Sequence, residues 1–130
     1  MTIRMTTVLS TLMICMLLPF TAMAEVAESY KCKTNPGVSR QQIADMGTSY
    51  IEVGRAKGYD DFHLTLQFPM YAADMSNGTF YWNGTSPTMA TMEEAIAIWV
   101  SAENSEALSM WVELVQDCES ASLYSSIPIS

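Results

Sequence analysis

The side chains best suited to chemistry lie on one predicted strand. His63, Thr65 and Gln67 alternate with apolar residues in the segment 61–84. Because successive side chains of a strand point to opposite faces, these three share one face. His63 is the only histidine of the chain, and histidine is the side chain that exchanges a proton most readily near neutral pH. His63 is therefore the candidate catalytic acid or base.

Further polar side chains extend this face. Tyr71 follows on the same strand, and Tyr81 and Asn83 would join it from the next strand. If a second sheet covered the face, these groups would line a cavity for a small polar or aromatic ligand. The candidate ligand-binding residues are Thr65, Gln67, Tyr71, Tyr81 and Asn83. The simpler interpretation is a polar sheet face that meets solvent or an interface.

The sequence predicts neither a metal site nor a cofactor. Asp60 and Asp61 precede His63, but adjacent carboxylates before a strand are commonly solvated, and one histidine is too few for most metal sites. No nucleophile elbow, phosphate-binding glycine loop or Cys–His pair is present. Whether the protein is an enzyme therefore stays open.

The face opposite His63 is apolar and requires a cover. Its members recur at every second position: Phe62, Leu64, Leu66, Phe68 and Met70. After a polar loop that ends in Asn77-Gly78, the alternating run 79–83 follows. Asn-Gly between two alternating runs indicates a hairpin, because both residues tolerate positive φ.

Helices are predicted on both sides of this hairpin. Ser39 with Gln42 forms a capping-box pattern that begins the first helix, and Gly58 fits its C-cap. The expected core side of this helix is Ile43, Met46, Tyr50 and Val53. After the hairpin, Ser86 is the expected N-cap of a second helix, with Pro87 at its first position.

The apolar stripe of that second helix contains Met89, Met92, Ile96 and Trp99. A further helix is expected over 106–116, with Leu108, Trp111, Val112 and Val115 on its apolar side. Short strands at 29–33 and 117–126 complete the order β-α-β-β-α-β. Two right-handed crossovers then give an α+β domain, a four-stranded antiparallel sheet in the order 4-1-3-2 with helices on one face.

The cysteines support this topology. Cys15 lies in the leader described below, so the domain keeps Cys32 and Cys118. Two cysteines in an exported domain of this size most simply form a disulfide. In the predicted order the end of the first strand lies beside the start of the last one, which is where these two residues fall.

Residues 1–24 have the pattern of a cleaved signal peptide. Arg4 precedes an apolar run from Val8 to Phe20, and Ala22-Met23-Ala24 is a small-x-small cleavage site. We therefore expect one domain over 25–130, exported to the periplasm or the exterior, with no membrane span after cleavage. That domain keeps five basic residues, all before position 58, against fourteen acidic ones. Such a charge disfavours nucleic acid as a partner.

The chain resembles a group of uncharacterised secreted bacterial proteins. The resemblance rests on the N-terminal cysteine strand, the run LTLQFP, the segment FYWNGTSP, a tryptophan-bearing helix and the closing DCESASLYSS. The layout also resembles the ferredoxin-like fold and, within it, the dimeric α/β-barrel proteins, whose sheets pack face to face. Because the strand alternation gives only one sheet face a helical cover, we expect a homodimer formed through the open sheet face, which binds a small ligand or a protein partner there. The alternatives are a cofactor-independent barrel-type enzyme that uses His63, and a structural envelope-associated protein.

Overall fold

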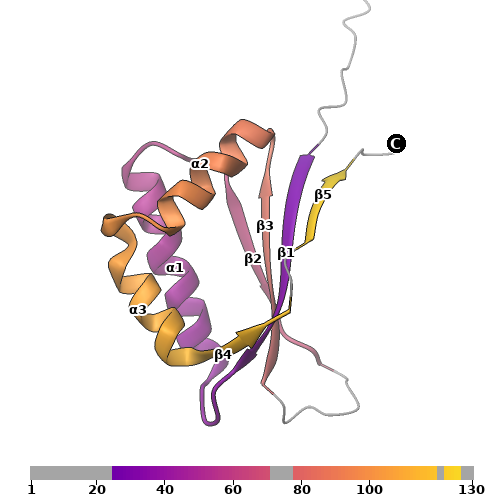
Figure 1. Cartoon of the computed structure of the whole chain (residues 1–130), viewed down its shortest axis with the longest axis vertical. Coiled ribbons are helices and arrows are strands. Elements are labelled where there is room, and N and C mark those ends of the chain that lie inside the picture. Colours follow the sequence, from indigo (N-terminus) through magenta and orange to yellow (C-terminus); the bar gives the residue numbers. More distant parts are fainter. Residues whose placement is uncertain (1–24, 71–77, 120–121, 127–130) are drawn as a thin grey trace, which may run out of the picture.

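The protein is a two-layer α+β domain, known here from a computed structural model that describes residues 25–70, 78–119 and 122–126. Figure 1 shows the helices as one layer and the sheet as the other. The elements are, in chain order, β1 (Glu25–Thr34), α1 (Arg40–Ala56), β2 (His63–Gln67), β3 (Thr79–Ser86), α2 (Met89–Trp99), a 3-10 turn (Ala102–Asn104), α3 (Ser105–Leu114), β4 (Val115–Cys118) and β5 (Ser122–Ser126).

The sheet is antiparallel, with the strand order β2-β3-β1-β4 and with β5 paired farther along β1. This confirms the predicted fold class and neighbours. The predicted last strand over 117–126 is instead two strands, so the sheet has five. Cys32 is opposite Cys118, but Ser29 is opposite Ser122, so the pairing with β1 shifts by one residue between β4 and β5.

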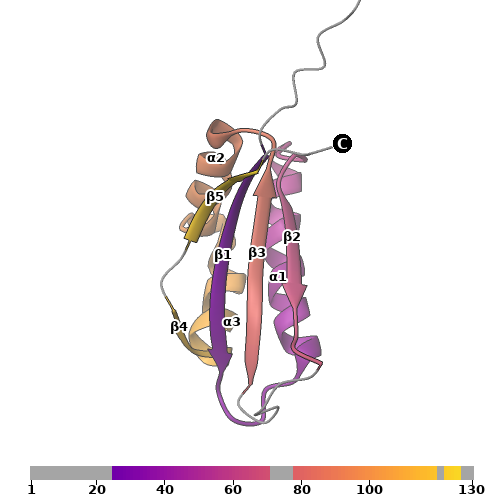
Figure 2. The same ribbon diagram turned by 90° about the vertical axis from the view of Figure 1, so that its right-hand side faces the viewer.

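Only one face of the sheet is covered by helices. Figure 2 shows the uncovered face toward the viewer, with α1, α2 and α3 behind the strands. In β3 the residues on the helical side are buried, whereas those on the other side are half-exposed. We call the uncovered side the open face.

The start of α1 matches the prediction. The Ser39 side chain accepts a hydrogen bond from the Gln42 backbone N–H, and the Gln42 side chain accepts one from the Ser39 N–H. Ile43, Met46 and Tyr50 are buried, as expected. Lys57 rather than Gly58 is the C-cap. Gly58 follows it with a φ of 84°, a conformation that costs glycine little because it has no Cβ.

The predicted start of the second helix is wrong. Ser86 is the last residue of β3, where it pairs with Val26, and Thr88 is the N-cap of α2. The Thr88 hydroxyl accepts from the Thr91 backbone N–H, and the Thr91 hydroxyl accepts from the Thr88 N–H. Pairing with β1 continues as far as Ser86, so Ser86 stays in the strand and the reciprocal threonine cap begins the helix two residues later than predicted.

The predicted apolar stripes of α2 and α3 are only partly correct. Met92 is buried, but Met89 and Ile96 are nearly half exposed, and Val112 is 78% exposed. Residues of α2 and α3 buried against the core include Ala95, Ile98, Ala107 and Leu114. Val115 is buried as the first residue of β4 instead of lying on the helix. Small alanine side chains face the core because they allow close packing of helix on sheet, and a search for large apolar residues passes over them.

The apolar face of β2 is shorter than predicted. Phe62, just before β2, is buried, and Leu64, Leu66 and Phe68 pack against the core. Met70 lies beyond the end of the strand at Gln67 and is 66% exposed, so its assignment to the apolar face is wrong. The predicted loop residues 72–77 and the predicted leader 1–24 lie outside the described residues.

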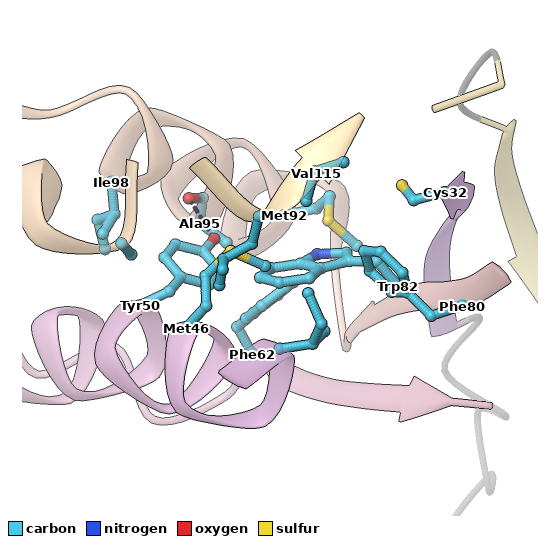
Figure 3. Close-up of a cluster of buried hydrophobic side chains, with 13 residues drawn as sticks. Cys32, Met46, Tyr50, Phe62, Phe80, Trp82, Met92, Ala95, Ile98 and Val115 are labelled. Carbon is cyan, nitrogen blue, oxygen red and sulfur yellow. Dashed lines mark hydrogen bonds between the residues drawn. The ribbon is translucent and has the colours of Figure 1, made fainter. Parts of the chain in front are cut away.

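The Cys32–Cys118 disulfide is present and joins β1 to β4, and every other helix and strand except β5 lies between them in sequence. Cys32 is 2% exposed and belongs to the apolar core. Figure 3 shows side chains from α1, α2 and the sheet gathered around Trp82, with Met46, Tyr50, Phe62 and Met92 among them. The core is therefore rich in aromatic rings.

Candidate functional site

The structure places five of the six predicted site residues together on the open face. His63, Thr65 and Gln67 are exposed on β2, and Tyr81 and Asn83 are half-exposed on the neighbouring β3. Tyr71 lies outside the described residues. Thr65 is opposite Asn83, and Gln67 is opposite Tyr81.

A short chain of hydrogen bonds crosses this face. The Ser29 hydroxyl donates to Asn83 Oδ1 over 2.6 Å, and Asn83 Nδ2 donates to Gln67 Oε1 over 3.2 Å. The two bonds link β1, β3 and β2. His63 lies in the next row, opposite Thr85. In the single chain this face is a polar surface with an ordered amide at its centre, and its use as a site stays a prediction.

A partly open site that the sequence analysis did not predict lies on the other side of the sheet. A cavity of about 80 Å³ opens between the sheet and the helices. Its lining contains one carboxyl group, five aromatic rings and one aliphatic side chain: Glu28, Tyr30, Tyr50, Trp82, Trp99, Trp111 and Ile96. We call it the aromatic cavity.

Glu28 is the charged group of the aromatic cavity. It lies in the middle of β1, opposite Gly84 on β3 and Leu123 on β5, and is 7% exposed. The Tyr30 hydroxyl donates to Glu28 Oε2 over a long 3.4 Å. Among the described residues no lysine, arginine or histidine forms an ion pair with it. Burial without a cation disfavours the charged carboxylate.

The ionisation of the site follows from this burial. Burial raises the pKa of Glu28 above its ordinary value, and the hydrogen bond from Tyr30 opposes that rise. Burial also raises the pKa of Tyr30, and the nearby Glu28 charge adds to it. The pKa of Tyr50 is raised strongly, chiefly by burial. Both tyrosines therefore stay neutral at physiological pH, and Glu28 is the acidic group of the cavity lining.

The rings of the aromatic wall pack edge to face against one another. Trp99 has its ring centroid 5.0 Å from Tyr50, 5.3 Å from Trp82 and 5.2 Å from Trp111, at interplanar angles of 88°, 63° and 80°. Trp82 and Trp111 are 5.5 Å apart at 88°. The Tyr50 hydroxyl donates to the Ala95 carbonyl over 2.6 Å, which ties α1 to α2. Edge-to-face pairs of this kind add to the stability given by burial alone.

Replacing Glu28 with glutamine is expected to change how stability depends on pH. The folded state holds the Glu28 proton more tightly than the unfolded chain does. As pH rises above the ordinary glutamate value of 4.5, the unfolded chain therefore loses this proton first, and the free energy of unfolding falls until pH passes the folded-state pKa. Glu28→Gln has no such proton, so it should gain stability relative to the wild type as pH rises from 4.5 toward the folded-state pKa of Glu28. Each unit of pKa elevation corresponds to about 1.4 kcal/mol.

Urea unfolding at several pH values would measure this difference. Glu25→Gln, at the exposed start of the same strand, controls for the loss of one negative charge. A wild type and a Glu28→Gln variant with parallel pH profiles would show that Glu28 ionises normally in the fold.

Gly84 lies opposite Glu28 on the neighbouring strand β3, close to the Glu28 carboxyl group. A Cβ at this position would lie 2.6 Å from the Phe62 ring and 2.7 Å from Glu28 Oε1, closer than side chains approach one another. Gly84→Ala is therefore expected to displace both groups and to cost about 1 to 3 kcal/mol of unfolding free energy. Thr85→Ala, on the open face of the same strand, should change it by less than about 0.5 kcal/mol. Thermal unfolding of the two variants tests this, and equal melting temperatures would contradict the close packing.

Two other features bear on the type of site. In the described part of the chain, no three His, Cys, Asp or Glu side chains are grouped so that they could hold a metal ion. Over the same residues, no helix combines the length and apolar character needed to cross a membrane. The aromatic cavity itself presents one carboxyl group and an aromatic surface.

Comparison with solved structures identifies the architecture. SnoaB, a cofactor-independent oxygenase from Streptomyces nogalater, superposes with a TM-score of 0.57 at 10% identity, over 82% of this chain and 96% of that one. A dimeric ferredoxin-like protein of unknown function from Thermobifida fusca gives 0.51 at 12%, over 79% and 92%. The hydroxynitrile lyase of Passiflora edulis gives 0.54 at 12%, over 83% and 98%.

The chain has a ferredoxin-like fold. No family model matches it, and no curated protein matches it significantly in sequence. These three solved structures of similar fold are an oxygenase, a lyase and a protein of unknown function, and a fold of this kind supports many activities. The function must therefore be argued from the site.

Proposed function

We propose that this protein is an exported small-ligand-binding domain whose ligand occupies the aromatic cavity. The observation that carries the proposal is Glu28, a buried carboxyl group without a basic partner among the described residues, at the wall of a cavity lined by aromatic rings. Ligand sites combine a mostly apolar lining with a few fixed polar groups. A buried ionisable group with a perturbed pKa in such a place is a typical sign of function.

The cavity has a route to solvent. Ile96 lines it and is 45% exposed, so this side chain forms part of its rim. The opposite walls are fixed by α1 through Tyr50 and by β3 through Trp82. A ligand can therefore enter past α2 without opening the core.

We also propose that two copies associate through the open face. The face has no helical cover, and the relative from Thermobifida fusca is described as dimeric. A second sheet packed there would enclose His63, Thr65, Gln67, Tyr81 and Asn83. Those residues would then be interface groups or a second binding surface, and a catalytic role for His63 would depend on the partner sheet. Export is supported by the disulfide, which persists in oxidising compartments.

Intrinsic fluorescence gives a direct test of the cavity. All three tryptophans of the chain line it, so ligand entry should change the tryptophan emission. A library of small organic fragments would be titrated into the oxidised protein, and binding confirmed by calorimetry. At least one fragment is expected to bind saturably.

Two matched variants of α2 locate the binding. Ile96→Trp places a bulky ring at the rim and should abolish fragment binding. Val100→Trp adds the same ring one turn away, at a position that is 71% exposed and does not line the cavity, and should leave binding unchanged. Fragments that bind equally to both variants would place the ligand elsewhere. Native mass spectrometry of the same material gives the subunit count, and a monomer at tens of micromolar would overturn the dimer.

A further inference from the structure

We infer that the aromatic cavity recognises an organic cation, namely an alkylated ammonium head group. This inference rests on the proposed ligand site and names its chemical class. It combines three independent features of the cavity: a carboxyl group that no basic side chain among the described residues neutralises, a wall of tryptophan and tyrosine, and a volume suited to a small head group.

The first feature is the missing positive charge. Burying a carboxylate is costly unless a cation accompanies it. The cavity lining contains no lysine, arginine or histidine. On β1, Lys31 and Lys33 flank Cys32 in the alternation and point to the open face, where Lys31 pairs with Glu119 over 2.9 Å. A bound cation would supply a positive charge to balance the Glu28 carboxylate.

The second feature is the aromatic wall. The face of an aromatic ring is electron-rich and attracts cations, most strongly for tryptophan. Quaternary and methylated ammonium groups are recognised in cages of several such rings, because their charge is spread over methyl groups that also gain from apolar burial. Here Trp82, Trp99 and Trp111 come from three different elements and meet Tyr30 and Tyr50 around one space. A carboxyl group at one side of such a cage adds charge complementarity.

The third feature is size and access. A cavity of about 80 Å³ accommodates a head group of a few heavy atoms, not a whole polycyclic ligand. The partly exposed Ile96 at the rim allows an attached chain to run outward over apolar surface. The formal net charge of −8 further favours the approach of a cation.

Cation binding should be coupled to the Glu28 proton. The titratable groups that face Glu28 within the described cavity are Tyr30 and Tyr50, and burial keeps both neutral. A cation favours the carboxylate form and so releases the Glu28 proton. Affinity should therefore increase as pH rises, and the increase should disappear in Glu28→Gln.

The test uses tetramethylammonium chloride as the cationic probe and tert-butanol as a neutral probe of similar shape. Each is titrated into the oxidised wild-type protein at pH 5 and pH 8, with sodium chloride holding the ionic strength constant. Tryptophan fluorescence and calorimetry report binding. We expect saturable binding of tetramethylammonium, at least about tenfold tighter than tert-butanol, and tighter at pH 8 than at pH 5.

Variants separate the contributions of charge and rings. Glu28→Gln should weaken tetramethylammonium about tenfold or more and remove the pH dependence, without changing the affinity for tert-butanol. Trp111→Leu should weaken the cation about fivefold, whereas Trp111→Phe should restore part of the loss. Circular dichroism of each variant verifies the fold.

The outcomes distinguish this inference from the proposed function. Equal binding of both probes, with sensitivity to Ile96→Trp, would overturn the cation inference and leave the ligand site standing. Saturable binding of neutral fragments without any binding of tetramethylammonium would likewise overturn the cation inference and leave the ligand site standing. If neither probe nor any fragment binds in an Ile96-dependent way, both are wrong.

Discussion

Removing the disulfide with Cys32→Ala and Cys118→Ala together is expected to lower the free energy of unfolding by about 4 to 5 kcal/mol. The bond joins residues 86 positions apart, and closing so long a loop restricts the unfolded chain strongly. Total stabilities of small domains are about 5 to 15 kcal/mol, so most of the margin could be lost. Urea unfolding followed by tryptophan fluorescence would measure the change.

Reduction of the wild type provides the control for this variant. If the cross-link is the cause, reduced wild type and the double alanine variant should unfold at similar urea concentrations. A variant as stable as the oxidised protein would show that strand pairing alone holds β4 against β1.

Trp82→Ala is expected to be the most damaging single change in the core, at about 3 to 5 kcal/mol. Trp82 is 4% exposed and its ring contacts those of Tyr50, Trp99 and Trp111. Its loss would leave a void that edge-to-face neighbours cannot fill without breaking their own contacts. The melting temperature of the purified variant measures the effect.

Trp111→Ala serves as the comparison, because Trp111 lies at the side of the same cluster and is only half-buried. It should cost clearly less than Trp82→Ala. Equal losses would mean that the cluster behaves as one unit, in which any ring is as important as the central one.

The sequence predicts the overall topology well, because several local signals agree. Alternation in β2 and β3, the Ser39–Gln42 capping box and the placement of Cys32 and Cys118 all indicate the same order of strands. Each depends on short-range geometry that residue types encode directly. The structure confirms the α+β class, the strand neighbours and the disulfide.

Details that depend on tertiary contacts were not predictable in this way. Ser86 belongs to β3 because β1 continues opposite it. Met89 and Ile96 are exposed because Ala95 and Ile98 are the residues of α2 that are buried, next to Tyr50 and Gly54 of α1. The spacing of large apolar residues does not show which side of a short helix faces the core. That choice is made by the packing partner, here Tyr50 and its neighbours on α1.

The aromatic cavity was missed because its members come from five elements. Glu28 stands two positions before Tyr30 and four before Cys32, so the period-two pattern that places Cys32 in the core also places Glu28 there. This signal was available in the sequence. The tryptophans, in contrast, could only be assigned to a general core, since nothing in their spacing shows that they surround one carboxyl group. The proposed role of His63 and its neighbours is still a prediction.

The position of β1 in the sheet has a consequence for the rate and order of folding. β1 is the first strand of the domain, yet its partners β3, β4 and β5 all lie in the later part of the chain. Contacts between residues so distant in sequence form slowly, because a long loop must close before any pairing is gained. While the chain is being made, β1 has no partner strand until β3 has been synthesised. We therefore expect folding to be slow for a domain of this size, with both edges of β1 open to wrong partners until β3 arrives.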